Sequence, residues 1–157
     1  MSDQLTRTPP QNLEAEQSLL GSIFLDKDAM FKINDIVGAE DFYKDSHRYI
    51  YETIVELHDR HEPIDILSVG NRLEEKKQLE TVGGRSYLIT LTNIVPSSYN
   101  IAHYANIVHK KATLRRLIGA ANDISQSGYD ESQELDHVLD HAQQKLFGVS
   151  QKFLKQT

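Results

Sequence analysis

Apolar residues recur along this chain at intervals of three and four, the spacing that places them on one face of an α-helix. Residues 13–25 follow this spacing, and Gln11 or Asn12 stands ahead of them where a helix cap is expected. No stretch alternates for long as a strand would. Further helices are predicted near residues 26–33, 46–62, 66–73 and 87–94. Asp45 or Ser46 can cap the helix near 46–62, and the aromatic residues Phe42 and Tyr43 just before it are expected to fill part of the core.

The last third of the chain has a different organisation. Residues 96–98 read Pro-Ser-Ser and indicate a joint, after which Asn100 can cap the longest helical pattern, which continues to about Ser127. Gly128 interrupts this pattern, and a return helix is predicted over residues 132–149. Two helices joined by so short a loop form an antiparallel hairpin.

The hairpin carries more apolar surface than its own two helices can cover. The first seam of the long helix is Ile107, Leu114, Ile118, Ala121 and Ile124, its second seam is Ile101, Ala105, Val108 and Ala112, and the return stripe is Leu135, Val138, Leu139, Ala142, Leu146 and Val149. We expect these side chains to hold the hairpin together, with Leu139 facing inward, and to pair it with another copy. The alternative is that the hairpin folds back on the preceding helices as one bundle.

These patterns predict an all-α fold with a small helical head followed by a protruding antiparallel helical hairpin. The expected parts are a flexible leader (1–10), the head (11–95), a dimerising hairpin (96–150) and the start of a linker (151–157). A chain of 157 residues is long enough for one such domain.

Composition and charge narrow the functions that this fold can serve. The net charge is -6, so the chain as a whole should repel a phosphate backbone, and no strong direct binding of nucleic acid is expected. Cysteine is absent, which excludes disulfides and thiolate metal sites and fits a reducing cytoplasm. No apolar run approaches the roughly 20 residues that span a bilayer. We therefore expect a soluble cytoplasmic protein that does not bind membranes.

The sequence contains none of the common catalytic or phosphate-binding motifs. GxxxxGK[ST], GxSxG and HExxH do not occur, so no phosphate-binding loop is present and no catalytic, cofactor or metal residue is assigned. Gly83 and Gly84 precede a short helix, where a turn with positive φ explains them better than an anion site.

Three residue clusters leave alternatives open. His137 and His141 share a helix face and could bind a metal, although the solvated side of an amphipathic helix is the simpler interpretation. His58-Asp59, with His47 and Asp123, follows the residue order of helical metal-dependent phosphohydrolases. A basic cluster could make the chain a nucleic-acid adaptor, or could pair with Asp136 or Asp140 across the hairpin; its members are Lys110, Lys111, Arg115 and Arg116.

Local strings in a fixed order resemble the N-terminal domain of the DnaB-type replicative helicases of bacteria. The strings are PPQNLEAEQSLLG (9–21), DFY (41–43), EPID (62–65), VGGRSYL (82–88), PSSYN (96–100) and, in the hairpin, YANIV, LRRLI, DIS and SGY. Each is short, but together they occur in one order from residue 9 to residue 129, which is more specific than a single motif.

The resemblance implies an assembly domain that has no catalytic activity of its own. In this family the hairpins pair so that six copies form a collar, a trimer of dimers, on a ring of ATPase domains that bind ATP and Mg and move on single-stranded DNA. Those ATPase domains are absent from this chain, so no cofactor is expected in it. Primase docks on the collar, and the helicase loader is a further candidate partner. Carried over by position, the primase contacts are Glu14, Tyr87, Ile118 and Ile124.

Overall fold

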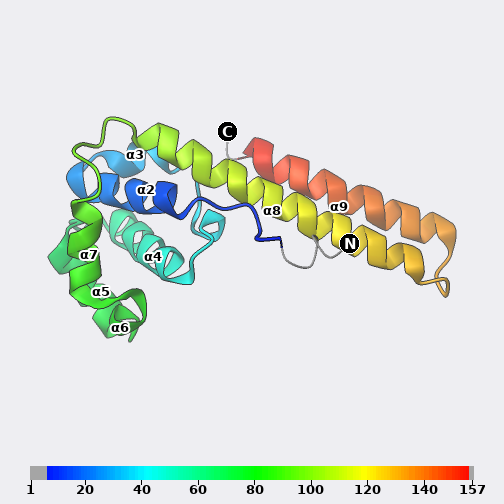
Figure 1. Ribbon diagram of the computed structural model, residues 1–157, viewed down its shortest axis with the longest axis horizontal. Coiled ribbons are helices and arrows are strands. Elements are labelled where there is room, and N and C mark those ends of the chain that lie inside the picture. The colour runs from blue at the N-terminus through cyan, green and yellow to red at the C-terminus, as the bar shows by residue number, and fades with distance from the viewer. Residues whose placement is uncertain (1–6, 156–157) are drawn as a thin grey trace.

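A computed structural model describes residues 7–155 of the chain, and throughout that range the regular elements are helices (Figure 1). The head and hairpin that the apolar spacing predicts are both present. Among the described residues, no helix could span a lipid bilayer. In chain order the elements are α2 (Leu13–Leu25), α3 (Ala29–Ile33), η1 (Ala39–Asp41), α4 (Asp45–Asp59), α5 (Ile66–Glu75), α6 (Leu79–Val82), α7 (Gly84–Thr92), α8 (Ile101–Tyr129) and α9 (Leu135–Lys155).

Helix α2 is the centre of the head and contacts α3, α4, α7 and α8. It begins as the sequence predicts, because the Asn12 side chain accepts a hydrogen bond from the Ala15 N–H at 2.9 Å. Leu19, Leu20 and Ile23 are fully buried on its inner side. A Cβ added at Gly21 would lie 2.2 Å from the Leu91 carbonyl oxygen, so glycine is required where α2 meets α7.

The short elements of the head differ from the sequence prediction in two places. The four-residue helix α6 was not predicted, because Gly83 reads as a breaker; the structure has this residue at φ +108, ending α6 and beginning α7. Phe42 and Tyr43 were both expected in the core. Phe42 is buried, but Tyr43 is 37% exposed, and the Arg115 guanidinium lies 5.4 Å from the centre of its ring.

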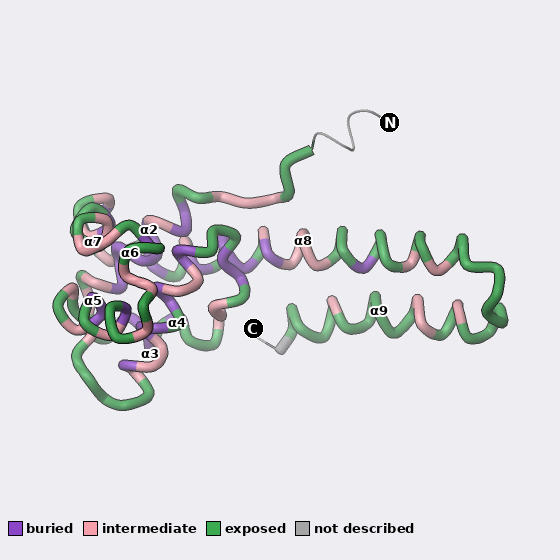
Figure 2. Tube along the Cα trace, turned by 90° about the horizontal axis from the view of Figure 1, so that it is seen from below, coloured by how far each residue is buried: buried purple, intermediate pink, exposed green. Residues whose placement is uncertain are grey.

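The second apolar seam of α8 packs on the head, which corrects its predicted role in dimerisation. Its four members are buried within this chain because the first half of α8 lies across α2, α3 and η1: Ile101, Ala105, Val108 and Ala112. Beyond them α8 leaves the head and runs antiparallel to α9 as a protruding hairpin, whose outer part is mostly exposed (Figures 1 and 2). The bundle alternative is therefore wrong.

Both ends of the described chain are held against neighbouring elements. The Pro10 carbonyl accepts a hydrogen bond from Arg115 at 2.7 Å, so this end of the predicted flexible leader lies along α8. Helix α9 continues to Lys155, five residues into the predicted linker, and the Lys152 ammonium lies 3.7 Å from the Glu40 carboxylate. The remainder of the leader (1–6) and of the linker (156–157) lies outside the described residues.

Candidate interaction site

A buried polar network joins α2, α4 and α7 on one side of the head. Glu16 of α2 is 1% exposed, and its carboxylate lies 2.8 Å from Nδ1 of His47 in α4, which is also fully buried. The other ring nitrogen of His47, Nε2, lies 2.6 Å from the Tyr87 hydroxyl of α7. One assignment of protons satisfies all three groups: Nδ1 donates to Glu16, Tyr87 donates to Nε2, and the Tyr87 oxygen accepts from Gln17 at 3.3 Å.

Glu16 also binds the backbone that leads into the helix carrying its partner. Its carboxylate accepts hydrogen bonds from the Tyr43 and Lys44 N–H groups, at 2.7 and 3.3 Å, just ahead of the first residue of α4. Asp45 or Ser46 was the predicted cap, but the N-cap residue is Lys44, whose side chain makes no capping hydrogen bond, and Asp45 is already the first residue of the helix. A carboxylate at this end of a helix satisfies backbone donors and is favoured by the helix dipole.

The network holds the Tyr87 ring in a defined position at the surface. The ring stacks on His47 with 5.9 Å between centroids and 9° between planes, and the Lys44 ammonium lies 5.5 Å from its centre. Burial raises the pKa of the Tyr87 hydroxyl, the hydrogen bond from Gln17 opposes this rise, and the Glu16 charge adds to it. Tyr87 therefore remains a neutral, half-buried aromatic whose orientation is set by its own head domain.

A second buried network fastens α8 to the head. Asp41 of η1 is fully buried; its carboxylate accepts hydrogen bonds from the Gly38 N–H at 3.0 Å, from His109 Nδ1 at 3.2 Å, and from Arg116. The His109 ring stacks on Phe153 of α9, with centroids 5.3 Å apart. This network therefore joins the head, α8 and the end of α9 at one point.

Arg115 and Arg116 have different partners from those that the sequence predicts. Arg116 pairs with Asp41, and Arg115 donates to the backbone carbonyls of Asp41 and Pro10, both at 2.7 Å. Burial lowers the pKa of Arg115, which the neighbouring carboxylates of Glu16 and Asp41 partly oppose. The expected pairing across the hairpin with Asp136 or Asp140 is not made by these two arginines, because both face the head.

The hairpin exposes a large part of its apolar stripes. Leu135, Leu139 and Leu146 of α9 are 69%, 53% and 50% exposed, which corrects the expectation that Leu139 faces inward. Helix α8 covers only one edge of the α9 stripe. The residues on that edge are half-buried between the two helices: Val138, Ala142 and Val149 of α9, with Ile124 of α8. Leu117 and Ile118 of α8 are 42% and 47% exposed, while Leu114 is half-buried.

The four predicted primase contacts lie on two separate parts of the molecule. Glu14 is exposed in the first turn of α2, and Tyr87 lies on α7, so both belong to the head. Ile118 and Ile124 belong to the outer half of α8. Ile118 also lines a cavity of about 730 Å³ between α8 and leader residues 7–10.

Sequence reasoning did not identify the buried polar residues Glu16, His47, Asp41 and His109 as a group. One signal was available for Glu16, because it lies three, four and seven positions ahead of Leu19, Leu20 and Ile23, on the apolar face of its helix. A carboxylate on such a face requires a buried partner. No comparable signal marks Asp41, which lies in a short 3-10 turn.

The residues of the phosphohydrolase alternative are dispersed in the fold. His47 is enclosed with Glu16, His58 packs edge-on against Phe31, and Asp123 pairs with Lys145 on the hairpin at 3.3 Å. Within residues 7–155 no three His, Cys, Asp or Glu side chains are grouped so that they could hold a metal ion. The structure therefore does not favour this alternative.

Comparison with known families agrees with this architecture. Residues 8–110 match a family described as the DnaB-like helicase N terminal domain. The chain belongs to this family. A crystal structure of the N-terminal domain of DnaB helicase from Mycobacterium tuberculosis superposes with a TM-score of 0.86 at 39% identity, covering 90% of this chain and 99% of that one. The all-helical head with its hairpin is thus the fold of the DnaB N-terminal domain.

Relatives of this DnaB-type domain are considerably longer. The replicative DNA helicase DnaB of Geobacillus stearothermophilus is 44% identical over 146 residues, which are 93% of this chain and 32% of that protein. The replicative DNA helicase DnaC of Bacillus subtilis (strain 168) is 43% identical over 153 residues, 97% of this chain and 34% of that protein. The chain therefore spans about a third of these curated relatives.

A second solved structure describes a DnaB-like replicative helicase and its interactions with primase. It matches with a TM-score of 0.75 at 25% identity, covering 88% of this chain and 31% of that one. The agreement includes both the head and the hairpin, because only a small part of this chain lies outside it.

Proposed function

We propose that this chain is the assembly and primase-docking domain of a replicative DNA helicase, and that it acts in the cytoplasm by binding rather than by catalysis. The observation that carries the proposal is the family match, which covers the head and the first ten residues of α8. The relatives are named replicative helicases, and a structural relative is described with its primase interactions. ATP and Mg would bind in a separate ATPase domain of such a helicase.

Self-association is the first part of this function. Leu117 on α8 and Leu135, Leu139 and Leu146 on α9 are all more than a third exposed, an unusual density for a small monomeric protein. The second seam of α8 is not assigned to dimerisation, because the head of the same chain covers it. We assign dimerisation to these exposed side chains, with a trimer of dimers as the form in a complete helicase.

The double variant Leu139→Asn with Leu146→Asn tests this assignment. If both leucines become buried between two copies, their loss weakens the dimer by about tenfold or more, since burying one Leu contributes about 1.5–3 kcal/mol. Light scattering over a concentration series measures the shift towards monomer. Leu67→Asn on α5, at a residue that is 67% exposed, is the matched control and should leave the mass unchanged. A wild-type chain that stays monomeric at every concentration contradicts the assignment.

Primase docking is the second part of this function. Tyr87 offers a half-buried aromatic ring whose orientation is already set, and such rings are frequent centres of binding energy. Ile118 offers exposed apolar surface beside the cavity along the leader. Glu14 is exposed and contributes a negative charge at the edge of the proposed primase contact. Ile124 is half-buried in the hairpin, so its substitution should disturb the hairpin before it affects a partner.

The variants Tyr87→Ala and Ile118→Asn test the docking proposal. Each is expected to weaken binding of the helical C-terminal region of primase by about 1–3 kcal/mol, measured by isothermal titration calorimetry. Tyr99→Ala is the control, because Tyr99 is an 89% exposed aromatic in the joint before α8. Absence of binding by the wild-type chain would refute primase docking itself, whereas equal affinity for all variants would refute only the contact residues.

A further inference from the structure

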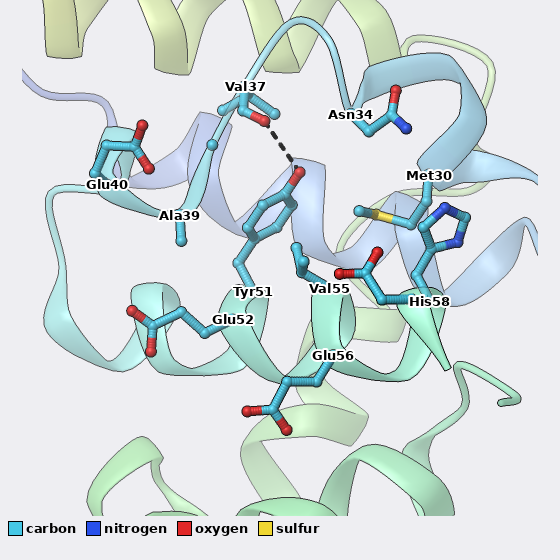
Figure 3. Close-up of a pocket in the computed structure, with 12 residues that line it drawn as sticks. Met30, Asn34, Val37, Ala39, Glu40, Tyr51, Glu52, Val55, Glu56 and His58 are labelled. Atoms are coloured by element: carbon cyan, nitrogen blue, oxygen red, sulfur yellow. Dashed lines mark hydrogen bonds between the residues drawn. The ribbon is translucent and has the colours of Figure 1, made fainter. Parts of the chain in front are cut away.

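A groove on the face of the head formed by α3, η1 and α4 is not used by the proposed function. Its volume is about 510 Å³, and its floor is apolar, with Met30, Val37 and Val55 among the residues that line it. In Figure 3, Glu40 and Glu52 lie on one side of the Tyr51 ring, and Met30 and His58 on the other. The hydroxyl of Tyr51 donates to the Val37 carbonyl at 3.2 Å, which holds the loop before η1 against α4.

Four carboxylates surround this apolar floor. Glu40, Glu52, Glu56 and Asp59 all line the groove, and no Lys or Arg is among the described residues that do so. Glu56 is paired with Arg72 and Lys76, at 2.7 and 3.2 Å, and Glu40 with Lys152. For Glu52 and Asp59 the described part of the chain supplies no hydrogen bond or ion pair. Two of the four charges therefore have no cation partner among the described residues.

An exposed aromatic residue stands beside the groove. Phe31 of α3 is 71% exposed, and its ring packs edge-on against His58, a lining residue, with centroids 5.0 Å apart. Exposed aromatics next to apolar hollows are common anchors in protein interfaces. The rim charges, the floor and this ring are thus adjacent parts of one surface.

The chemistry of this surface limits what can bind to it. Carboxylates around the rim repel nucleic acid and anionic lipid headgroups. A single metal ion is not favoured either, because among the described residues no three ligating side chains are grouped. An apolar floor inside an acidic rim complements a protein segment that has apolar anchors and flanking cations.

We infer that this groove docks a basic amphipathic helix from a partner protein. Glu52, Glu56 and Asp59 follow the spacing i, i+4 and i+7 on one face of α4, over about 10 Å of helix. A partner helix lying along α4 places Lys or Arg at the same spacing against these carboxylates, and an apolar side chain between them enters the floor beside Val55. The surface is separate from Tyr87 and Ile118, so this partner can bind independently of primase docking.

The probe for this inference is a short synthetic helical peptide with Arg at i, i+4 and i+7 and Leu at i+3. Fluorescence anisotropy with the full chain at about 0.1 M salt measures its affinity, because charged contacts are only partly screened there. A peptide with Glu at the three Arg positions is the reference and is expected not to bind. Amide chemical shifts of the chain locate the peptide, and we expect the changes to concentrate in residues 30–40 and 51–59.

Matched variants separate docking in the groove from general attraction of charge. Glu52→Gln with Asp59→Asn should weaken binding roughly tenfold, since two surface ion pairs are lost. Phe31→Ala should also weaken it severalfold. The controls should change the affinity less than about twofold. The charge control is Glu131→Gln with Glu134→Gln, at two exposed acids before α9. The aromatic control is Tyr129→Ala, at an 85% exposed residue at the hairpin tip.

Two results would overturn the inference. The first is an equal loss in the groove and control variants, or shift changes spread over all acidic surfaces, since either indicates only non-specific attraction. The second is the same set of shift changes on raising the protein concentration without peptide, because the occupant is then a second copy of this chain. Neither result bears on primase binding, which is measured separately.

Discussion

Replacing Asp41 by Ala should lower the free energy of unfolding by about 3–5 kcal/mol, because a buried ion pair is broken and one charge is left behind. The Asp41 carboxylate is fully buried and accepts hydrogen bonds from Gly38, His109 and Arg116. Without it, the Arg116 guanidinium, which is only 20% exposed, has no carboxylate to face. Urea denaturation followed by circular dichroism measures the loss.

Asp45→Ala is the matched control for this variant. Asp45 also pairs with an arginine, Arg48, at 2.8 Å, but its side chain is 72% exposed, so its loss should cost less than about 1 kcal/mol. Similar losses in the two variants would mean that burial of Asp41 does not determine its contribution. Amide hydrogen exchange adds a local test, because α8 should lose protection near His109 if Asp41 fastens it to the head.

The head illustrates what a sequence can predict well. Helix α2 has the predicted bounds, Leu13–Leu25, because its start depends on a local signal, the Asn12 cap, and its length on the run of apolar residues behind that cap. The start of α5 also depends on a local cap, because the Asp65 side chain accepts a hydrogen bond from the Ser68 N–H at 2.7 Å. Both signals lie within four residues of the position that they determine.

The hairpin illustrates where periodicity is insufficient. The apolar period of α8 shows that the face with Ile101 and Val108 must be buried, but it does not show which surface covers that face. In the structure the head covers it, rather than a second copy. The α9 stripe has the opposite outcome. Its period is that of an inward face, yet α8 covers only one edge, and Leu139 on the other edge stays exposed. Helix-to-helix geometry decides both cases, and it depends on the whole fold.

Buried charges were the hardest feature to predict. Glu16 and its partner His47 are 31 positions apart, and Asp41 and Arg116 are 75 apart, so no local pattern connects either pair. Glu14 was carried over from the same string by position in the family resemblance, and Glu16 was not considered, because a carboxylate is exposed by default. The candidate site was therefore predicted at Tyr87, while the residues that hold Tyr87 in place were not.

Glu16→Ala is expected to destabilise the chain by about 2–5 kcal/mol, because each buried donor left without an acceptor costs about 1–3 kcal/mol. The donors are Nδ1 of His47 and the N–H groups of Tyr43 and Lys44. Glu14→Ala, two residues earlier, is the control. Glu14 is exposed in the first turn of α2, where a carboxylate contributes about 0.3–1 kcal/mol through the helix dipole.

The two glutamates should also differ in how they affect the partner surface. Loss of Glu16 removes the group that orients His47, and His47 in turn holds the Tyr87 hydroxyl, so the Tyr87 ring loses its fixed position at the surface. Primase binding should then weaken in Glu16→Ala even at temperatures where the variant is folded. In Glu14→Ala the ring stays in place, and only a rim charge is lost. Aromatic side-chain NMR signals of Tyr87 separate the two cases: unchanged signals in Glu16→Ala would show that the ring is held by packing and not by this network.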